Sequence, residues 1–389
     1  MQAISANKTA FFLKQKTVYI IYFLTINAMN IASVVSGRMN VWKIFRYSFS
    51  HLRQHTDLYA AYPQEHFDLY LYSPSFPVMF TPFALLPNYI AYFLWNNMSM
   101  LLMPFVIFKL KGISVQKKCL ICYIALLDML TCLQGTQTNV MICVLMVLAF
   151  LSFENKNSWI AAFAIAAGFY IKIYPVLAAS LFLLYPDKIK FIFRFIVAMI
   201  ILGALPLLFI RPPELVGLYH NWINELVLDQ KDNMGKISLT GLMQSYFNIS
   251  DFSKLIVQIL GVLVFCLMYI RQQLFKQYYY RLYFLCALLI WVTVFNHASE
   301  IYGYAIAIWG VGIWYTHQKS SRAMNIFICL FVCFATVLSI DPTPHIILDY
   351  IYAHGLKSLP FFLIFGVIVW QMLSKPAGFF SHSLAEDNK

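Results

Sequence analysis

Three acidic residues, Asp57, Glu65 and Asp68, stand close together in a polar stretch at residues 37–73. Aromatic residues surround them at Tyr59, Tyr62, Phe67, Tyr70 and Tyr72. A carboxylate in a partly apolar cleft binds its proton more tightly than one in water, so it can act as a general base near neutral pH. The three acids are therefore candidate catalytic bases. The alternative for each is solvation or an ion pair with a neighbouring arginine.

Positive groups that could hold a phosphate occur in the same part of the chain and beyond it. Lys172 interrupts an apolar run, and Arg46 lies inside the polar stretch. A lysine at the end of a membrane helix often only extends its ammonium group to the interface. Ionisable groups within membrane segments are also common functional sites. Both interpretations apply to Lys172.

Polar side chains also stand in two short connections between apolar segments. Gln137 and Asn139 follow Gly135 in one of them, and their amides suit either sugar hydroxyls or helix capping. His297 and Glu300 stand in the other; a histidine can bind phosphate or carry a proton near neutral pH. The alternative for this second pair is a capping role.

A metal site has little support from the spacing of histidines. His51 and His55 are four residues apart, as metal ligands on a helix often are, and His66 or Glu65 could serve as a third ligand. The H-E-x-x-H context is missing. We therefore predict no metal.

The composition identifies the elements that must position these groups as membrane helices. Of 389 residues, 61% are hydrophobic and 11% are charged, whereas about 25% of residues in soluble domains are charged. Apolar runs recur, and lipid forces each of them to be helical. We predict an all-α polytopic protein with the following twelve spans: 17–36, 88–110, 118–133, 140–153, 159–170, 175–185, 191–210, 253–270, 282–295, 301–315, 324–340 and 358–374.

Lysine and arginine orient these spans. They concentrate in short connections such as residues 109–118, 188–194 and 271–281, which the positive-inside rule assigns to the cytoplasm. Both termini are then cytoplasmic, in a multi-pass protein of the plasma or inner membrane, and the polar segments face outward. The net charge of +12 reflects this topology and contact with anionic lipid, so we expect no nucleic-acid partner.

The chain shows no internal repeat and no soluble domain. We predict one integral membrane domain over residues 1–389: a first span at 17–36, an outer functional loop at 37–73, the remaining spans within 88–374 and a cytoplasmic tail at 375–389. A further outer loop is expected at residues 211–252.

The outer loop at 37–73 begins with a helical pattern. Trp42, Phe45, Phe49 and Leu52 recur at helical spacing and share one face. Such a helix is expected to lie in the membrane interface, with this stripe as its anchor.

Several motifs resemble those of one enzyme family. Tyr72-Ser73-Pro74-Ser75-Phe76, then Pro82-Phe83-Ala84-Leu85-Leu86-Pro87 and Leu94-Trp95-Asn96, resemble the signature that follows the first loop in polyprenol-phosphate-mannose-dependent mannosyltransferases. These enzymes form glycosyltransferase family 87, with the GT-C membrane fold. Gly135 with Gln137 and Asn139 resembles the family's G-Q-x-N element in expanded form, and Ile171-Lys172-x-x-Pro175 resembles its I-K-x-x-P element. Order and spacing agree from about residue 38 to about 315.

The resemblance implies an outward-facing transferase whose substrates are a polyprenyl-phosphate sugar donor and a glycan or glycolipid acceptor. It implies no cofactor, since the donor is already activated, and a GT-C-like bundle of about 10–12 helices. It also implies an acid in the first outer loop as base. The family places an aspartate soon after the first span, where this chain has Asn40. Either Asp57, Glu65 or Asp68 has taken that role, or the chain belongs to a subgroup with different chemistry, or it is inactive.

The leading hypothesis is an inverting hexosyltransferase, with mannose as the expected sugar. Asp68 is the favoured base, ahead of Asp57 and Glu65. Lys172, with His297 or Arg46, would stabilise the departing phosphate, while Glu300, Gln137 and Asn139 would complete the donor site. The alternatives are a transporter or flippase of lipid-linked glycans, and a scaffold in an envelope-assembly complex.

Overall fold

The computed structural model describes residues 11–231, 237–319, 321–339 and 343–381, and within them it contains helices but no strands. The elements are α2 (Gln15–Ser36), α3 (Asn40–Arg53), α4 (Phe76–Ala84), α5 (Asn88–Lys109), α6 (Val115–Gln134), α7 (Asn139–Glu154), α8 (Ser158–Ile171), η1 (Tyr174–Leu184), α9 (Lys188–Gly203), η2 (Leu205–Leu208), α10 (Pro212–Lys231), α11 (Leu239–Phe247), α12 (Asp251–Leu267), η3 (Gln272–Lys276), α13 (Tyr278–Val294), η4 (Ile301–Gly303), α14 (Tyr304–Thr316), α15 (Arg322–Ala335), η5 (Val337–Ser339), α16 (His345–Ala353), α17 (Ser358–Ser374) and η6 (Ala377–Phe380).

Each of the twelve predicted spans coincides with a helical segment. The sixth is a 3₁₀ helix, η1, instead of an α-helix, and the seventh ends early, since α9 stops at Gly203. Among the described residues, α2 and α5 are individually long and apolar enough to cross a membrane, and α16 with α17 would form a third span bent by 52°. The chain is thus a helical membrane protein. The predicted tail at 375–389 is described as far as residue 381, and its remainder lies outside the described residues.

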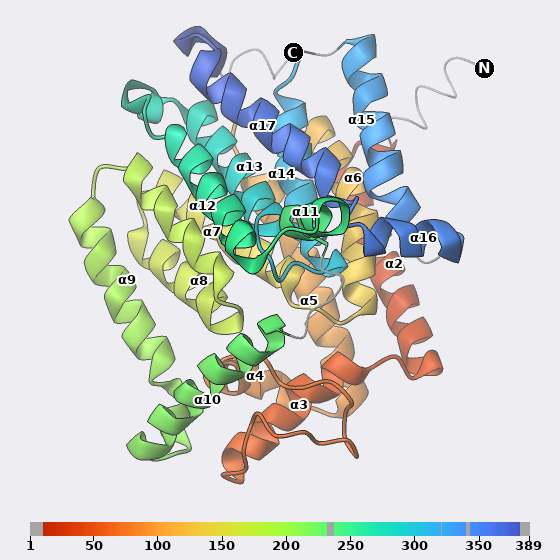
Figure 1. Cartoon of the computed structure of the whole chain (residues 1–389), viewed down its shortest axis with the longest axis vertical. Helices are drawn as coiled ribbons and strands as arrows, with labels where there is room; N and C mark the ends of the chain where they lie inside the picture. The colour runs from red at the N-terminus through yellow and green to blue at the C-terminus, as the bar shows by residue number, and fades with distance from the viewer. Residues whose placement is uncertain (1–10, 232–236, 320, 340–342, 382–389) are drawn as a thin grey trace.

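The bundle is layered around two central helices. α13 and α14 pack on each other and are buried almost all round. α9, α12 and α15 instead expose apolar side chains such as Phe193, Leu263 and Leu330. These exposed faces suit contact with lipid. Figure 1 shows α3, α4 and α10 together at the lower end of the molecule, which we call the α3/α10 pole.

The helix predicted from the aromatic stripe exists as α3, but its stripe is not a membrane anchor. Trp42, Phe45, Phe49 and Leu52 are each at most 5% exposed. Phe45 packs against Tyr72, Phe76, Phe80 and Trp95, and the Trp42 indole donates to Asn88 Oδ1 at 2.8 Å. The apolar face of α3 is buried against α4 and α5 within the protein. This packing fixes α3 on the bundle.

The expectation of a loop at 211–252 was wrong, because most of this segment is helical. It contains α10, α11 and the start of α12. Pro212 and Pro213 followed by Glu214 are a helix-start pattern that predicts α10, since proline is tolerated in the first turn and an acid there favours the helix dipole.

Asp128 has a structural role in a buried ion pair. Its Oδ1 lies 2.6 Å from Lys357 Nζ, and its Oδ2 accepts from Thr336 Oγ1 at 3.0 Å. The two charged side chains are 0% and 2% exposed. The pair joins α6 to the start of α17. A buried charge that loses its partner is strongly destabilising.

We predict that Lys357→Met destabilises the protein by about 3–5 kcal/mol, because it leaves the Asp128 carboxylate buried and unpaired. The double variant Lys357→Met, Asp128→Leu should recover most of this loss, since it removes both charges. Thermal unfolding in one detergent compares the two. A double variant as unstable as the single one would contradict this account.

Candidate functional site

A cavity of about 1180 Å³ opens where the α3/α10 pole meets the bundle. Four of the predicted site residues line it: Asp68, Gln137, Lys172 and Glu300. They come from the segment after α3, the turn between α6 and α7, the end of α8 and the connection before η4. The cavity therefore gathers two carboxylates, an amide and an ammonium group, and the two carboxylates, Asp68 and Glu300, are more than 200 residues apart in the chain.

Lys172 sits at the end of α8, in the motif Ile171-Lys172-x-x-Pro175. Its Nζ donates to Asn139 Oδ1 at 3.2 Å, and Tyr174 Oη donates to the same oxygen at 3.1 Å. Pro175 packs over Gly168, where an added Cβ would lie 2.9 Å from the proline ring. Asn139 thus contacts the cavity through Lys172 and does not line it.

Asp68 is exposed and is held by the first residue of α3. Asn40 Nδ2 donates to Asp68 Oδ2 at 2.7 Å, and Asn40 Oδ1 accepts from the Phe67 N–H at 2.9 Å. His66 Nδ1 also lies 2.8 Å from the Asp68 carbonyl oxygen. The residue that stands where a base was expected is therefore a direct partner of the favoured base.

The motif Tyr72-Ser73-Pro74-Ser75 ties the segment after α3 to the bundle. Ser73 Oγ donates to the Tyr170 carbonyl at 2.5 Å, and Ser75 Oγ donates to the Leu202 carbonyl at 2.7 Å. These carbonyls belong to the last turns of α8 and α9. The motif therefore sets the distance between the Asp68 segment and the end of α8 that carries Lys172.

The other two predicted bases do not line this cavity. Asp57 Oδ1 accepts from the Tyr59 N–H at 3.0 Å, which caps a local turn. Glu65 pairs with His51, whose Nε2 lies 3.0 Å away. Burial lowers the pKa of His51, and the Glu65 carboxylate partly offsets this effect. Both acids serve local structure in the loop.

Two of the predicted phosphate-binding groups also lie elsewhere. Arg46 donates to the Leu86 carbonyl at 2.9 Å, at the turn before α5. His297 Nδ1 lies 2.7 Å from Gln258 Nε2 on α12. Neither residue lines the cavity. His55 pairs with Glu214 on α10, at 2.8 Å, and so does not share a partner with His51.

The sequence did not single out several residues of the cavity wall. Glu225 and Asp229 lie on one face of α10, Arg38 follows α2, and Tyr302 belongs to η4. The helix-start pattern at Pro212 could have indicated α10, and the spacing of four between the two acids places them on one face. Gly135 permits the close approach of Tyr302, whose ring would lie 2.9 Å from an added Cβ.

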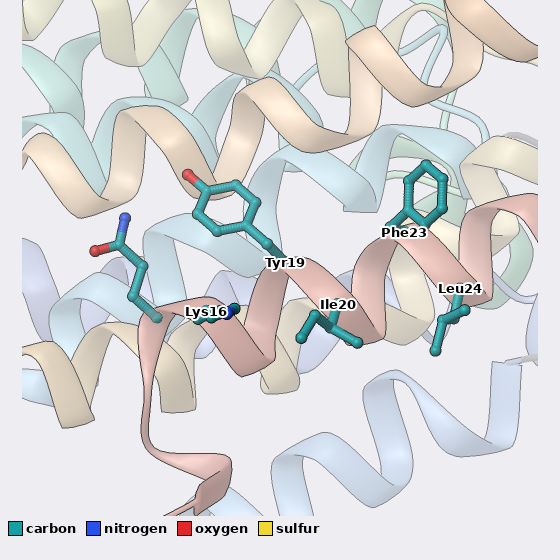
Figure 2. A pocket seen from close by; sticks show the side chains of 6 residues that line it. Lys16, Tyr19, Ile20, Phe23 and Leu24 are labelled. Atoms are coloured by element: carbon teal, nitrogen blue, oxygen red, sulfur yellow. The ribbon is translucent and has the colours of Figure 1, made fainter.

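A separate groove of about 670 Å³ runs along α2 (Figure 2). Its lining is mostly apolar and comes from α2 alone, with Tyr19, Ile20, Phe23 and Leu24 along the helix and Lys16 at one end. It contains no acid. The groove lacks a carboxylate beside a positive group, which sugar transfer from a phosphate donor would use. The cavity at the α3/α10 pole has both groups and is therefore the candidate site.

The profile of glycosyltransferase family 87 matches residues 70–296. The chain belongs to glycosyltransferase family 87. The matched part includes Gly135, Gln137 and Lys172, which line the cavity, and Ser73, which bonds to the end of α8. Asn40 and Asp68 precede it. A search of curated proteins finds no match to this chain.

In this family 87 chain, the turn that carries Gln137 holds one strained residue. Thr136 has φ = 50°, in the left-handed region that disfavours β-branched residues. Its side chain is 2% exposed, and its hydroxyl has no hydrogen-bond partner among the described residues. Such strain persists only where the surroundings impose it.

We predict that Thr136→Gly is more stable than Thr138→Gly by about 1 kcal/mol or more. Both changes remove a buried threonine side chain, but only the first relieves a left-handed backbone, since Thr138 has φ = −80°. Thermal unfolding of the two purified variants makes the comparison. Equal stability would show that the turn carries no strain.

Proposed function

We propose that the protein transfers a hexose, with mannose as the expected sugar, from a polyprenyl-phosphate donor to a hydroxyl group of a glycan or glycolipid. The observation that carries the proposal is the cavity that Asp68 and Lys172 line together. Membership of glycosyltransferase family 87 supports sugar transfer as the reaction. The cavity volume of about 1180 Å³ leaves room for a sugar, a phosphate and part of an acceptor.

The proposed reaction is a single displacement. The acceptor oxygen attacks the anomeric carbon as the bond between that carbon and the phosphate oxygen breaks. The electron pair of this bond leaves with the polyprenyl phosphate, and the acceptor proton passes to the Asp68 carboxylate. Attack from the face opposite the leaving group inverts the anomeric centre, through a transition state with oxocarbenium character.

Lys172 is proposed to stabilise the departing phosphate, which gains negative charge as the bond breaks. A positive group fixed in advance lowers the energy of that charge most effectively. The contact with Asn139 Oδ1 supports this role, because it holds the ammonium group at the cavity wall. Gln137 and Glu300, in the same wall, are proposed to bind sugar hydroxyls.

We propose that the cavity opens on the outer face of the plasma or inner membrane. α5 begins beside Trp42 at the α3/α10 pole and ends at Lys109, and α9 ends beside Ser75 and begins at Lys188. These lysines therefore lie at the helix ends away from the cavity. The positive-inside rule then supports a cytoplasmic position for the basic ends. An activated lipid-linked donor needs no further cofactor for this chemistry.

We predict that Asp68→Asn lowers transfer by at least about 100-fold, because an amide cannot accept the proton. The assay follows radiolabel from polyprenyl-phosphate mannose into glycolipids of membranes that contain the variant. Asp57→Asn is the matched control, since it makes the same change in the same loop outside the cavity lining, and it should keep most of the activity.

Normal transfer by Asp68→Asn would remove Asp68 from the mechanism. Loss of transfer in Asp57→Asn alone would move the base to that residue. Uptake of intact labelled lipid into sealed vesicles, without transfer, would instead indicate a transporter.

A further inference from the structure

We propose that Asn40 is the positioning residue for Asp68, and that its side-chain amide aims one carboxylate oxygen of Asp68 into the cavity. This inference rests on the proposed function, in which Asp68 is the base. Asn40 makes two hydrogen bonds to consecutive residues, one to the Phe67 N–H and one to the Asp68 carboxylate. Both Asn40 and Asp68 line the cavity.

The two contacts together settle which way the amide faces. The Phe67 backbone N–H can only donate, so the atom that it contacts must be the amide oxygen. The amide nitrogen therefore faces Asp68 Oδ2, at 2.7 Å, and can only donate to it. This contact leaves Asp68 Oδ1 as the oxygen that takes the proton of the acceptor.

Asp68 needs such a partner because its own backbone does not fix it. It lies in the irregular stretch between α3 and α4, and its side chain is exposed. Asn40 is the first residue of α3, whose apolar face is buried against α4 and α5. The hydrogen bond from the Asn40 amide therefore anchors the exposed Asp68 carboxylate to a packed helix.

An aspartate at position 40 would keep the size of the side chain and the hydrogen bond from the Phe67 N–H. Its contact with Asp68 would change from a hydrogen bond to repulsion between two carboxylates. Two carboxylates at hydrogen-bond distance retain a shared proton to higher pH than one carboxylate does. The other charged groups that line the cavity are Arg38, Lys172, Glu225, Asp229 and Glu300. Asn40→Asp leaves all of these in place.

The test is the pH dependence of kcat for transfer from polyprenyl-phosphate mannose, measured with the full chain in detergent. In Asn40→Asp, the acidic limb of the profile should move upward by at least about one pH unit. In Asn40→Ala, kcat should fall about 10- to 100-fold at every pH, because the carboxylate loses its orientation. The donor KM should change less than about twofold in both variants, since Lys172 is untouched.

Asn224→Asp is the matched control. It adds the same charge to an exposed asparagine on α10, which contacts His220 and not Asp68. Its profile should superimpose on that of the unmodified protein. Thermal unfolding of each variant checks that the fold is intact. The side chain of Asn40→Asp has the same shape as that of asparagine, so its melting temperature should lie within a few degrees of that of the unmodified protein.

Unchanged profiles and kcat in Asn40→Asp and Asn40→Ala would overturn this inference. Asp68→Asn separates that result from failure of the proposed function. If Asp68→Asn is inactive while the Asn40 variants behave as the unmodified protein, Asp68 remains the base and Asn40 does not position it. If Asp68→Asn is active, the proposed base itself is wrong.

Discussion

The irregular segment between α3 and α4 carries Asp68, and its main-chain polar groups must be satisfied without a helix. A buried carbonyl without a donor is costly, so each needs a partner. Aromatic side chains supply several: Trp222 Nε1 donates to the Leu71 carbonyl, Tyr59 Oη to that of Tyr72, and Tyr70 Oη to that of Ser73. Burial raises the pKa values of Tyr59 and Tyr70, so these hydroxyls remain donors.

This constraint explains why the segment is rich in tyrosine. Tyr59, Tyr62 and Tyr70 each donate a hydrogen bond from the hydroxyl to a carbonyl of the segment, while a tyrosine ring can cover apolar surface at the same time. With Ser73 and Ser75 bound to the ends of α8 and α9, the segment is held from several sides. The individual bonds each contribute about 0.5–1.5 kcal/mol. Together these bonds to the helix bundle fix the distance between the Asp68 segment and the end of α8.

Periodicity predicted α3 and the helices of the apolar ranges but not α10 or α11, and of the predicted site residues, Asp68, Gln137, Lys172 and Glu300 line the cavity. The apolar ranges matched helical segments because lipid leaves no other structure for such runs. The burial of the α3 stripe could not be predicted, since a stripe packed on α4 has the same pattern as one in lipid. The contact between Asn40 and Asp68 could not be predicted either, because the two residues are 28 positions apart and no local spacing indicates it. Arg46 and His297 are residue types that can bind phosphate. Their partners, the Leu86 carbonyl and Gln258, depend on tertiary packing and could not be predicted.

We propose that one cavity holds the donor phosphate against Lys172 while Asp68 faces the acceptor. A cryo-electron microscopy structure of the full chain with a non-transferable polyprenyl-phosphonate sugar analogue would show whether both contacts exist. Phosphonate density is expected within about 4 Å of Lys172 Nζ, with the sugar between Gln137 and Asp68. Analogue density at the α2 groove or elsewhere, with the cavity at the α3/α10 pole empty, would show that this cavity is not the donor site.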